Sequence, residues 1–165
     1  MRKLLGVLVV AGWAASLSAA DVPELIKKLG SKDNEERRAA AKELGEQAKD
    51  AKPAVAALTK ALKDDDSFVR RWSADALGKI GPDAKPSLPA LVAVLKMVPG
   101  GKKKNTDKDA DLRIEAATAL GHIASASDKD ALEALRDLGS GKNLKQNKGL
   151  GDAIKKAVQE IEMRK

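Results

Sequence analysis

The sequence predicts an all-α fold, a right-handed α-solenoid of about four helix pairs. The hydrophobic residues make up 43% of the chain and are mostly Ala, Leu and Val, whereas aromatic residues make up only 2%. Such a composition suits slim helices that pack closely better than it suits a β-sandwich or barrel. Apolar residues recur at helical spacing, and a segment of the chain repeats itself, which is typical of solenoids.

The first 20 residues have the order of a secretory signal peptide. Arg2 and Lys3 precede an apolar run of 12 residues, and small residues follow as far as Ala20. The run is too short to span a membrane comfortably, and no Cys is available for a lipoprotein anchor. We therefore expect cleavage after Ala20, export to the periplasm or the medium, and a repeat domain over 21–165. An uncleaved N-terminal anchor is the alternative.

The repeat has a period of 33 residues, because Ala51–Leu58 recurs at Ala84–Leu91. A third copy follows after 43 residues, so an insertion of ten residues lies between Leu95 and Asp109. Five positions recur in all three copies: Asp33, Arg37, Ala41, Leu44 and Gly45; Asp66, Arg70, Ala74, Leu77 and Gly78; and Asp109, Arg113, Ala117, Leu120 and Gly121.

Each repeat unit predicts two helices. The first helix begins with a proline in its first turn (Pro23, Pro53 or Pro86), where the missing N–H costs nothing, and Pro89 is tolerated for the same reason. The second helix follows an Asp-rich turn that can cap it. The expected pairs are 22–30 with 34–48, 53–63 with 67–80, 86–98 with 110–124, and 129–138 with 149–163.

The end units differ from the inner units. Glu36 and Gln47 stand in unit one where units two and three have apolar residues, and Gly151 stands in unit four where the other units have Arg. The terminal repeats of a solenoid expose one face to water, so polar substitutions are expected there.

The segments Asp66–Gly81 and Asp109–Ile123 share an Asp, an Arg and the run Ala-Leu-Gly-x-Ile. This pattern resembles the HEAT family, in particular its short phycobilisome-lyase-type HEAT-like repeats. The resemblance covers units one to three well and unit four weakly. It implies that the recurring Asp and Arg form a structural ladder between repeats; anion binding by the three arginines is the alternative. By family analogy, a lyase-like accessory protein or enzyme subunit is the alternative to a binding scaffold.

Other candidate sites receive structural interpretations. The recurring glycines predict close helix approach, and Asp64–Asp66 predicts a capping turn. His122 is the only His and there is no Cys, so we expect no metal, no cofactor and no enzyme activity. Gly139–Lys145 predicts a flexible turn rather than a phosphate loop. Lys102–Lys104 predicts a solvated loop; a docking point for an acidic partner or anionic lipid is the alternative.

The predicted binding surface lies on the second helices, on the stripe beside the core stripe. Recurring positions pack the solenoid, whereas these positions change from unit to unit, as expected of a scaffold that carries a specific surface. The stripe holds Trp72, Asp75 and Lys79, then Ala39, Lys42 and Glu46, and then Glu115, Thr118 and His122.

We expect a protein partner to bind at Arg71, Trp72, Asp75, Lys79 and His122, on the concave side. Trp72 is the only Trp beyond residue 20, and a partly exposed Trp is a common interface anchor. The alternative is that Trp72 packs between units two and three. Without Arg2 and Lys3 the formal net charge of +7 falls to +5, and this modest charge, with export, argues against nucleic-acid binding.

Overall fold

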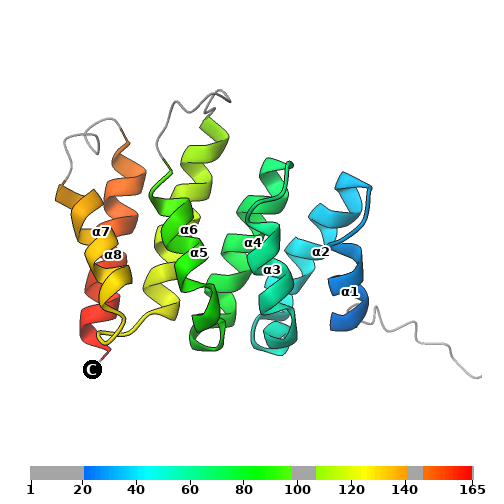
Figure 1. Ribbon diagram of the computed structural model, residues 1–165, viewed down its shortest axis with the longest axis horizontal. Coiled ribbons are helices and arrows are strands. Elements are labelled where there is room, and N and C mark those ends of the chain that lie inside the picture. The colour runs from blue at the N-terminus through cyan, green and yellow to red at the C-terminus, as the bar shows by residue number, and fades with distance from the viewer. Residues whose placement is uncertain (1–20, 98–106, 141–146, 165) are drawn as a thin grey trace, which may run out of the picture.

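The computed structural model describes residues 21–97, 107–140 and 147–164, and in this part of the chain all regular secondary structure is helical (Figure 1). Each predicted pair is present as a first and a second helix. The pairs are α1 (Val22–Lys28) with α2 (Asn34–Gln47), α3 (Val55–Ala61) with α4 (Ser67–Ile80), α5 (Leu88–Leu95) with α6 (Asp107–Ile123), and α7 (Lys129–Ser140) with α8 (Lys148–Met163).

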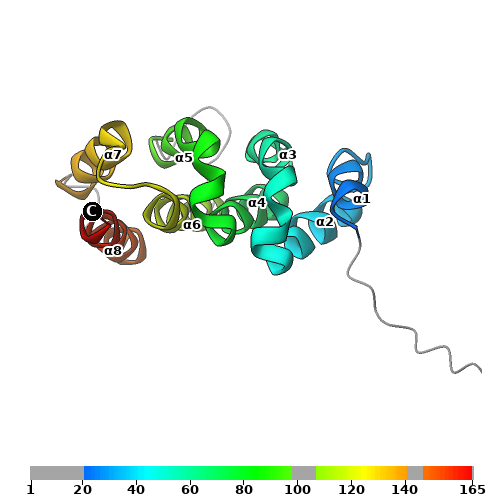
Figure 2. The same ribbon diagram turned by 90° about the horizontal axis from the view of Figure 1, so that it is seen from below.

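The helices form two rows (Figure 2). The first helices α1, α3, α5 and α7 make one row, and the second helices α2, α4, α6 and α8 make the other. Neighbouring second helices pack on each other along their lengths, whereas neighbouring first helices touch far less. The row of second helices is therefore the more tightly spaced one, as the inner side of a curved solenoid must be. The prediction of a solenoid of four helix pairs is confirmed.

Apolar side chains from both rows form one continuous core. The predicted core stripes of the second helices are buried in units two and three: Val69, Ser73, Ala76, Leu77 and Ile80, and Leu112, Ala116, Ala119, Leu120 and Ile123. Leu58 and Leu91 from the first helices are fully buried against them. The helical spacing of apolar residues therefore identified the faces that pack.

The recurring glycines lie where second helices approach most closely. A Cβ atom added at Gly78 would lie 3.1 Å from the Cα atom of Ala119, and one at Gly121 would lie 2.8 Å from that of Ala157. Gly45 faces Ala76 in the same way, at 3.3 Å. Only glycine leaves room for this spacing, which confirms that the repeated glycine serves packing.

The starts of three helices differ from the prediction. Pro53 and Pro86 lie inside 3-10 turns, η1 (Ala48–Ala54) and η2 (Gly81–Ser87), so α3 and α5 begin two residues after these prolines. Pro23 and Pro89 do lie in the first turns of α1 and α5, as predicted. In unit three, α6 begins at Asp107, three residues before the predicted start.

The solenoid has polar ends, as the end-unit substitutions predicted. Glu36 is exposed and Gln47 is half-buried, whereas their equivalents in unit two, Val69 and Ile80, are buried against unit one. Three further predictions lie wholly or mostly outside the described residues: the signal peptide over 1–20, the loop at Lys102–Lys104 and the turn at Gly139–Lys145. The first two residues of that turn belong to α7 instead. None of the described helices has the length and apolar character that crossing a lipid bilayer requires.

Candidate functional site

The recurring arginine of each unit holds the turn before its own helix. Arg37 donates to the carbonyl oxygens of Ser31 and Lys32, and Arg70 donates to the equivalent carbonyls of Asp64 and Asp65. In unit three, Nε of Arg113 donates to the carbonyl oxygen of Leu95 at 3.1 Å. Burial lowers the pKa of Arg113 from its usual value.

Arg37 also contacts unit two. Arg37 forks onto the carboxylate of Asp64 at 2.8 and 2.9 Å, and this hydrogen-bonded pairing raises the pKa of Arg37. Asp33 and Asp66 cap α2 and α4 by accepting backbone N–H bonds. The prediction of a capping turn at Asp64–Asp66 is therefore confirmed. Units one and two are linked by ion pairs, but not by the predicted ladder of recurring residues, because Arg37 binds Asp64 and the recurring Asp66 binds Arg38. The side chain of Asp109 lies outside the described part.

The candidate site is the solvent-facing side of the second helices, which we call the second-helix face. It consists of side chains that are half-buried or exposed and that come from successive units: Arg38, Phe68, Arg71, Trp72, Asp75, Lys79, Glu115 and His122. These residues stand on the rigid row of packed second helices. A surface built on such a row holds its side chains in fixed relative positions.

An aromatic pair lies on the central second helix. Phe68 and Trp72 are one helical turn apart on α4, and their ring centroids are 5.5 Å apart at a tilt of 38°. Phe68 is 39% exposed, whereas Trp72 is half-buried and packs against the core. The other Trp of the chain, Trp13, lies in 1–20. The Phe and Trp rings of the described residues thus meet at one place on the solenoid surface.

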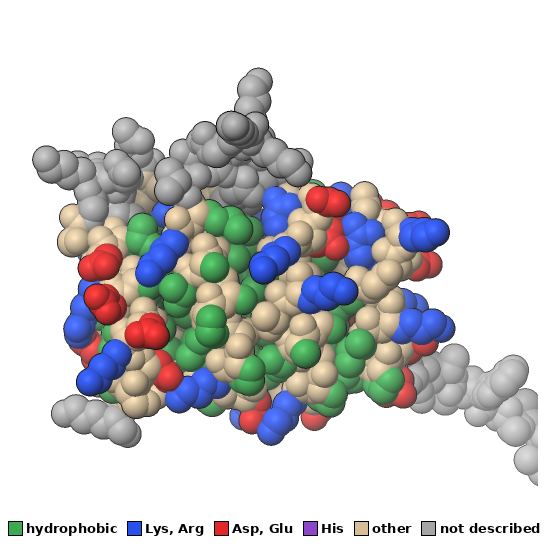
Figure 3. All heavy atoms as spheres, viewed as in Figure 1, with side chains coloured by type: hydrophobic (Ala, Val, Ile, Leu, Met, Phe, Trp, Pro, Cys, Tyr) green, Lys and Arg blue, Asp and Glu red, His purple; other side chains and the backbone are tan. Residues whose placement is uncertain are grey.

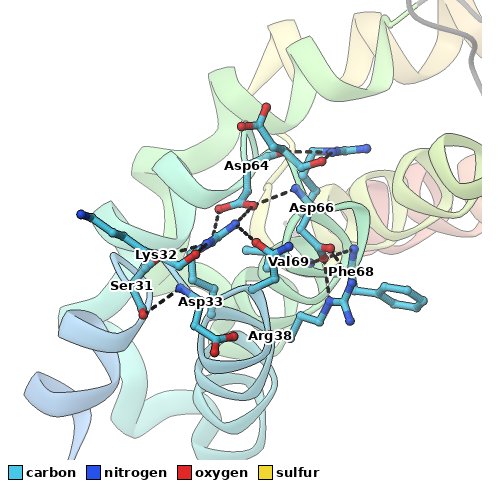
Figure 4. Close-up of polar contacts among 12 residues, drawn as sticks. Ser31, Lys32, Asp33, Arg38, Asp64, Asp66, Phe68 and Val69 are labelled. Carbon is cyan, nitrogen blue, oxygen red and sulfur yellow. Dashed lines mark hydrogen bonds and ion pairs between the residues drawn. The ribbon is translucent and has the colours of Figure 1, made fainter.

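Arg38 of unit one covers one side of this pair. Its guanidinium carbon lies 4.9 Å from the centre of the Phe68 ring, which is cation–π distance. Its nitrogens donate to the Asp66 carboxylate at 3.0 and 2.6 Å (Figure 4). This pairing, helped by the backbone N–H bonds of Val69 and Phe68, lowers the pKa of Asp66 from 3.8 to about 2.

Arg71 connects units two and three. It lies 3.3 Å from a carboxylate oxygen of Glu115 and 3.4 Å from one of Asp111, both on α6. Arg71 is the repeat equivalent of Arg38, so the same position contacts the next unit twice, each time with a different set of partners. The contact that links units one and two therefore also holds Arg38 against the aromatic pair.

The structure brings four of the five predicted site residues together. Arg71, Trp72, Asp75 and Lys79 lie along α4, where Lys79 pairs with Asp75 at 2.8 Å. His122 lies on α6 and faces α8, with its Nε2 atom 3.7 Å from Glu160. Its neighbours differ from those of the other four residues. From the sequence, Trp72 is expected either to be a partly exposed anchor or to pack between units. Its half-buried ring does some of both, because it contacts the core and also reaches solvent.

Sequence reasoning did not single out Phe68 or Arg38. The signal for Phe68 is that the only Phe of the chain precedes Trp72 by four residues, a spacing that places both rings on one helical face. The signal for Arg38 is that it precedes Arg71 by 33 residues, which is the repeat period.

Among the described residues, no group of three or more acidic or His side chains is arranged to hold a metal ion.

The helix pairs and their packing define the described chain as an α-solenoid module. The family model described as HEAT repeats matches residues 22–100, which hold units one and two and the first helix of unit three. The described chain is thus a HEAT-like repeat solenoid, and its similarity to the HEAT repeat family extends over this range. No curated protein matches the chain.

Solved structures that share the fold include engineered proteins of the Northeast Structural Genomics Consortium. One crystal structure is 26% identical with a TM-score of 0.62, over 85% of this chain and 62% of the other. A second is 25% identical with a TM-score of 0.62, over 86% of this chain and 63% of the other. The chain thus spans less than two thirds of the length of either engineered protein.

Proposed function

We propose that this protein is a non-catalytic scaffold module that binds a protein partner through its second-helix face. The observation that carries the proposal is the aromatic pair of Phe68 and Trp72, half-exposed on the central second helix and framed by ionic contacts. Trp and other aromatic side chains dominate the binding energy of many interfaces when polar residues surround them. HEAT repeats characteristically serve as scaffolds for protein–protein interaction.

The side chains around the pair support a preorganised site. Arg38 is held by Asp66, and Arg71 is held by Glu115 and Asp111, so a partner does not have to order these long side chains. The same carboxylates neutralise both arginines. The face therefore lacks the uncompensated positive charge that a nucleic acid would need, and this favours a protein partner.

The surroundings of His122 support a structural role rather than a catalytic one. Its imidazole faces Glu160 across the contact between α6 and α8, and Arg164 donates to its backbone carbonyl at 2.6 Å. Imidazole catalysis needs a nucleophile or a substrate proton within hydrogen-bond reach. We therefore assign His122 to the junction of units three and four.

The 33-residue period supports placing the units among the short phycobilisome-lyase-type HEAT-like repeats.

A photo-crosslinking experiment tests the proposal. A crosslinkable amino acid replaces Lys79, two turns after Trp72 on the same helix, and in a second variant it replaces Lys60 on α3, in the opposite row of helices. The first variant should capture a defined protein in the native host, and Phe68→Ser combined with Trp72→Ser should abolish that product. The proposal would be contradicted if a protein were captured only from position 60. It would also be contradicted if capture from position 79 were unchanged in the double variant.

Export is also part of the proposal. It is supported by the basic start, apolar run and small residues of 1–20, and α1 begins at Val22, so cleavage after Ala20 would leave every described helix intact. The intact mass of protein recovered from the periplasm or the medium tests it. A mass that starts at Asp21 supports export, whereas a mature form that retains Met1, or a purely cytosolic location, would contradict it.

A further inference from the structure

A groove of about 770 Å³ separates the first helices of units three and four, α5 and α7. It arises because the second helices behind it pack closely at Gly121 and Ala157, whereas α5 and α7 hardly touch. Its volume falls within the range of roughly 300–1,000 Å³ that binding pockets commonly have. The groove opens on the row of first helices, away from the second-helix face.

The floor of the groove is apolar. Leu88 and Val92 of α5 and Ala131 and Ala134 of α7 line it, and all four are buried or half-buried against the core. Small and aliphatic side chains on both walls leave a surface that favours apolar side chains of a ligand.

One wall of the groove carries unpaired negative charge. Asp130, Glu133 and Asp137 line the groove at positions i, i+3 and i+7 of α7, which places them on one helical stripe. Their carboxylates form no hydrogen bond or ion pair with any described residue. In the space-filling view, acidic side chains gather over α7 (Figure 3).

The lysines around the groove form no ion pair with this stripe. Lys85 pairs with Asp128 at 3.0 Å, outside the stripe, and Lys96 and Lys129 line the groove without an ion pair to any described residue. Burial would raise the pKa of Asp128, but the bonds from Ser125 and Lys85 outweigh burial and lower it. The smaller groove between α1 and α3 differs, because an arginine of unit one engages its Asp64.

From the apolar floor and the unpaired acidic stripe, we propose that the α5–α7 groove binds a basic amphipathic segment of a partner protein. Its apolar side chains would lie on Val92 and the exposed edge of Leu88, and Lys or Arg residues at helical spacing would pair with Asp130, Glu133 and Asp137. An extended stripe of carboxylates matches a row of cations better than a single ion. This site is independent of the second-helix face and does not rest on the function proposed above.

A charge-swap experiment with model peptides tests this site. The probe is a fluorescein-labelled helical peptide of Leu and Lys with Lys at i, i+3 and i+7, and its counterpart carries Glu in place of Lys. Fluorescence anisotropy should show that the Leu–Lys peptide binds the wild-type protein. Glu133→Lys combined with Asp137→Lys should weaken this binding by about tenfold or more and improve binding of the Leu–Glu peptide.

A matched control separates the groove from general charge. Glu36→Lys combined with Asp152→Lys makes the same change in net charge at exposed acidic residues elsewhere, and should leave Leu–Lys binding within about twofold. Glu133→Gln with Asp137→Asn supplies a milder second variant if the swap disturbs folding, which circular dichroism reports. Failure of the Leu–Lys peptide to bind, equal weakening by both charge reversals, or loss of binding in Trp72→Ser would overturn the proposal.

Discussion

The guanidinium group of Arg38 donates two hydrogen bonds to the carboxylate of Asp66, at 3.0 and 2.6 Å. The same carboxylate caps α4 by accepting the backbone N–H groups of Phe68 and Val69. One acidic side chain therefore starts the central second helix, joins units one and two, and positions Arg38 over the Phe68 ring. Asp66 therefore contributes both to the stability of the solenoid and to the arrangement of side chains at the candidate site.

Acid should destabilise the protein through Asp66. Its pKa is lowered to about 2 in the folded chain, so the stabilisation is fully present above the unfolded value near 4 and is lost as the pH falls from about 4 to 2. After allowance for solvent screening, the loss should be about 1–2 kcal/mol. Urea unfolding followed by circular dichroism at a series of pH values measures it.

The variant Asp66→Asn isolates the ion pair, because Asn caps a helix about as well as Asp. At pH 7 the variant should be less stable than wild type, and the difference should shrink towards zero near pH 2. A stability difference that stays constant from pH 7 to pH 2 would show that the pair with Arg38 contributes nothing.

The spacing of the second helices predicts that Gly121→Ala destabilises the protein. The new Cβ would lie 2.8 Å from the Cα and 3.0 Å from the Cβ of Ala157, so backbone has to move. Overpacking costs about 1–3 kcal/mol and exceeds the gain of up to about 1 kcal/mol in helix propensity. Gly149→Ala is the matched control, because its nearest neighbour is the flexible end of Ile114 at 3.2 Å. In thermal unfolding, Gly121→Ala should have a clearly lower melting temperature than Gly149→Ala. The reverse order would contradict the close approach of Gly121 to Ala157.

The end of α2 predicts a stabilising substitution. Ala48 has φ 48°, and its repeat equivalent Gly81 has φ 75°, a region that glycine enters without strain. Ala48→Gly should therefore stabilise the protein by about 0.5–1 kcal/mol, because relief of strain exceeds the added entropy of the unfolded chain. Ala124→Gly is the control, because it changes the equivalent position in unit three, where φ is not positive. This substitution should destabilise the protein slightly. Equal effects in chemical denaturation would contradict the strain at Ala48.

Deleting Pro99 to Lys108 should leave a folded solenoid. The deletion joins Val98 to Asp109 and restores the spacing that units one and two use between their helices, with only the first two residues of α6 removed. Shortening a surface connection changes mainly the entropy of loop closure. Circular dichroism at 25 °C should show undiminished helicity per residue. A loss of helical signal would show that the insertion packs into the solenoid.

The sequence predicted the helices well where local and repeat signals agree. Asp33 and Asp66 mark the starts of α2 and α4, and the recurring Leu and Gly mark the faces on which the helices pack. The 3-10 turns were missed, because Pro53 and Pro86 are compatible with the first turn of an α-helix as well as with a tighter turn. The early start of α6 was missed because the insertion interrupts the repeat there.

The site was predictable only in part, for a physical reason. Trp72, Asp75 and Lys79 follow from the geometry of one helix, so sequence spacing was enough to group them. Arg38 approaches the aromatic pair, and Glu115 approaches Arg71, only because neighbouring units pack together. The spacing of residues in the sequence gives little information about such contacts between units. The α5–α7 groove depends on how far apart two first helices stand, which no local pattern specifies.

The central claim is that Trp72 is an interface anchor on the second-helix face. Its ring is half-buried, so truncation should cost less stability than removing a fully buried residue of the same helix, such as Leu77. The direct measurement is binding of the crosslinked partner, once purified, to Trp72→Ser, with the unfolding free energy measured on the same sample. We predict that binding weakens by about 2 kcal/mol or more while stability changes little. Unchanged binding, or a loss of several kcal/mol of stability as in the truncation of a buried Trp, would contradict the account.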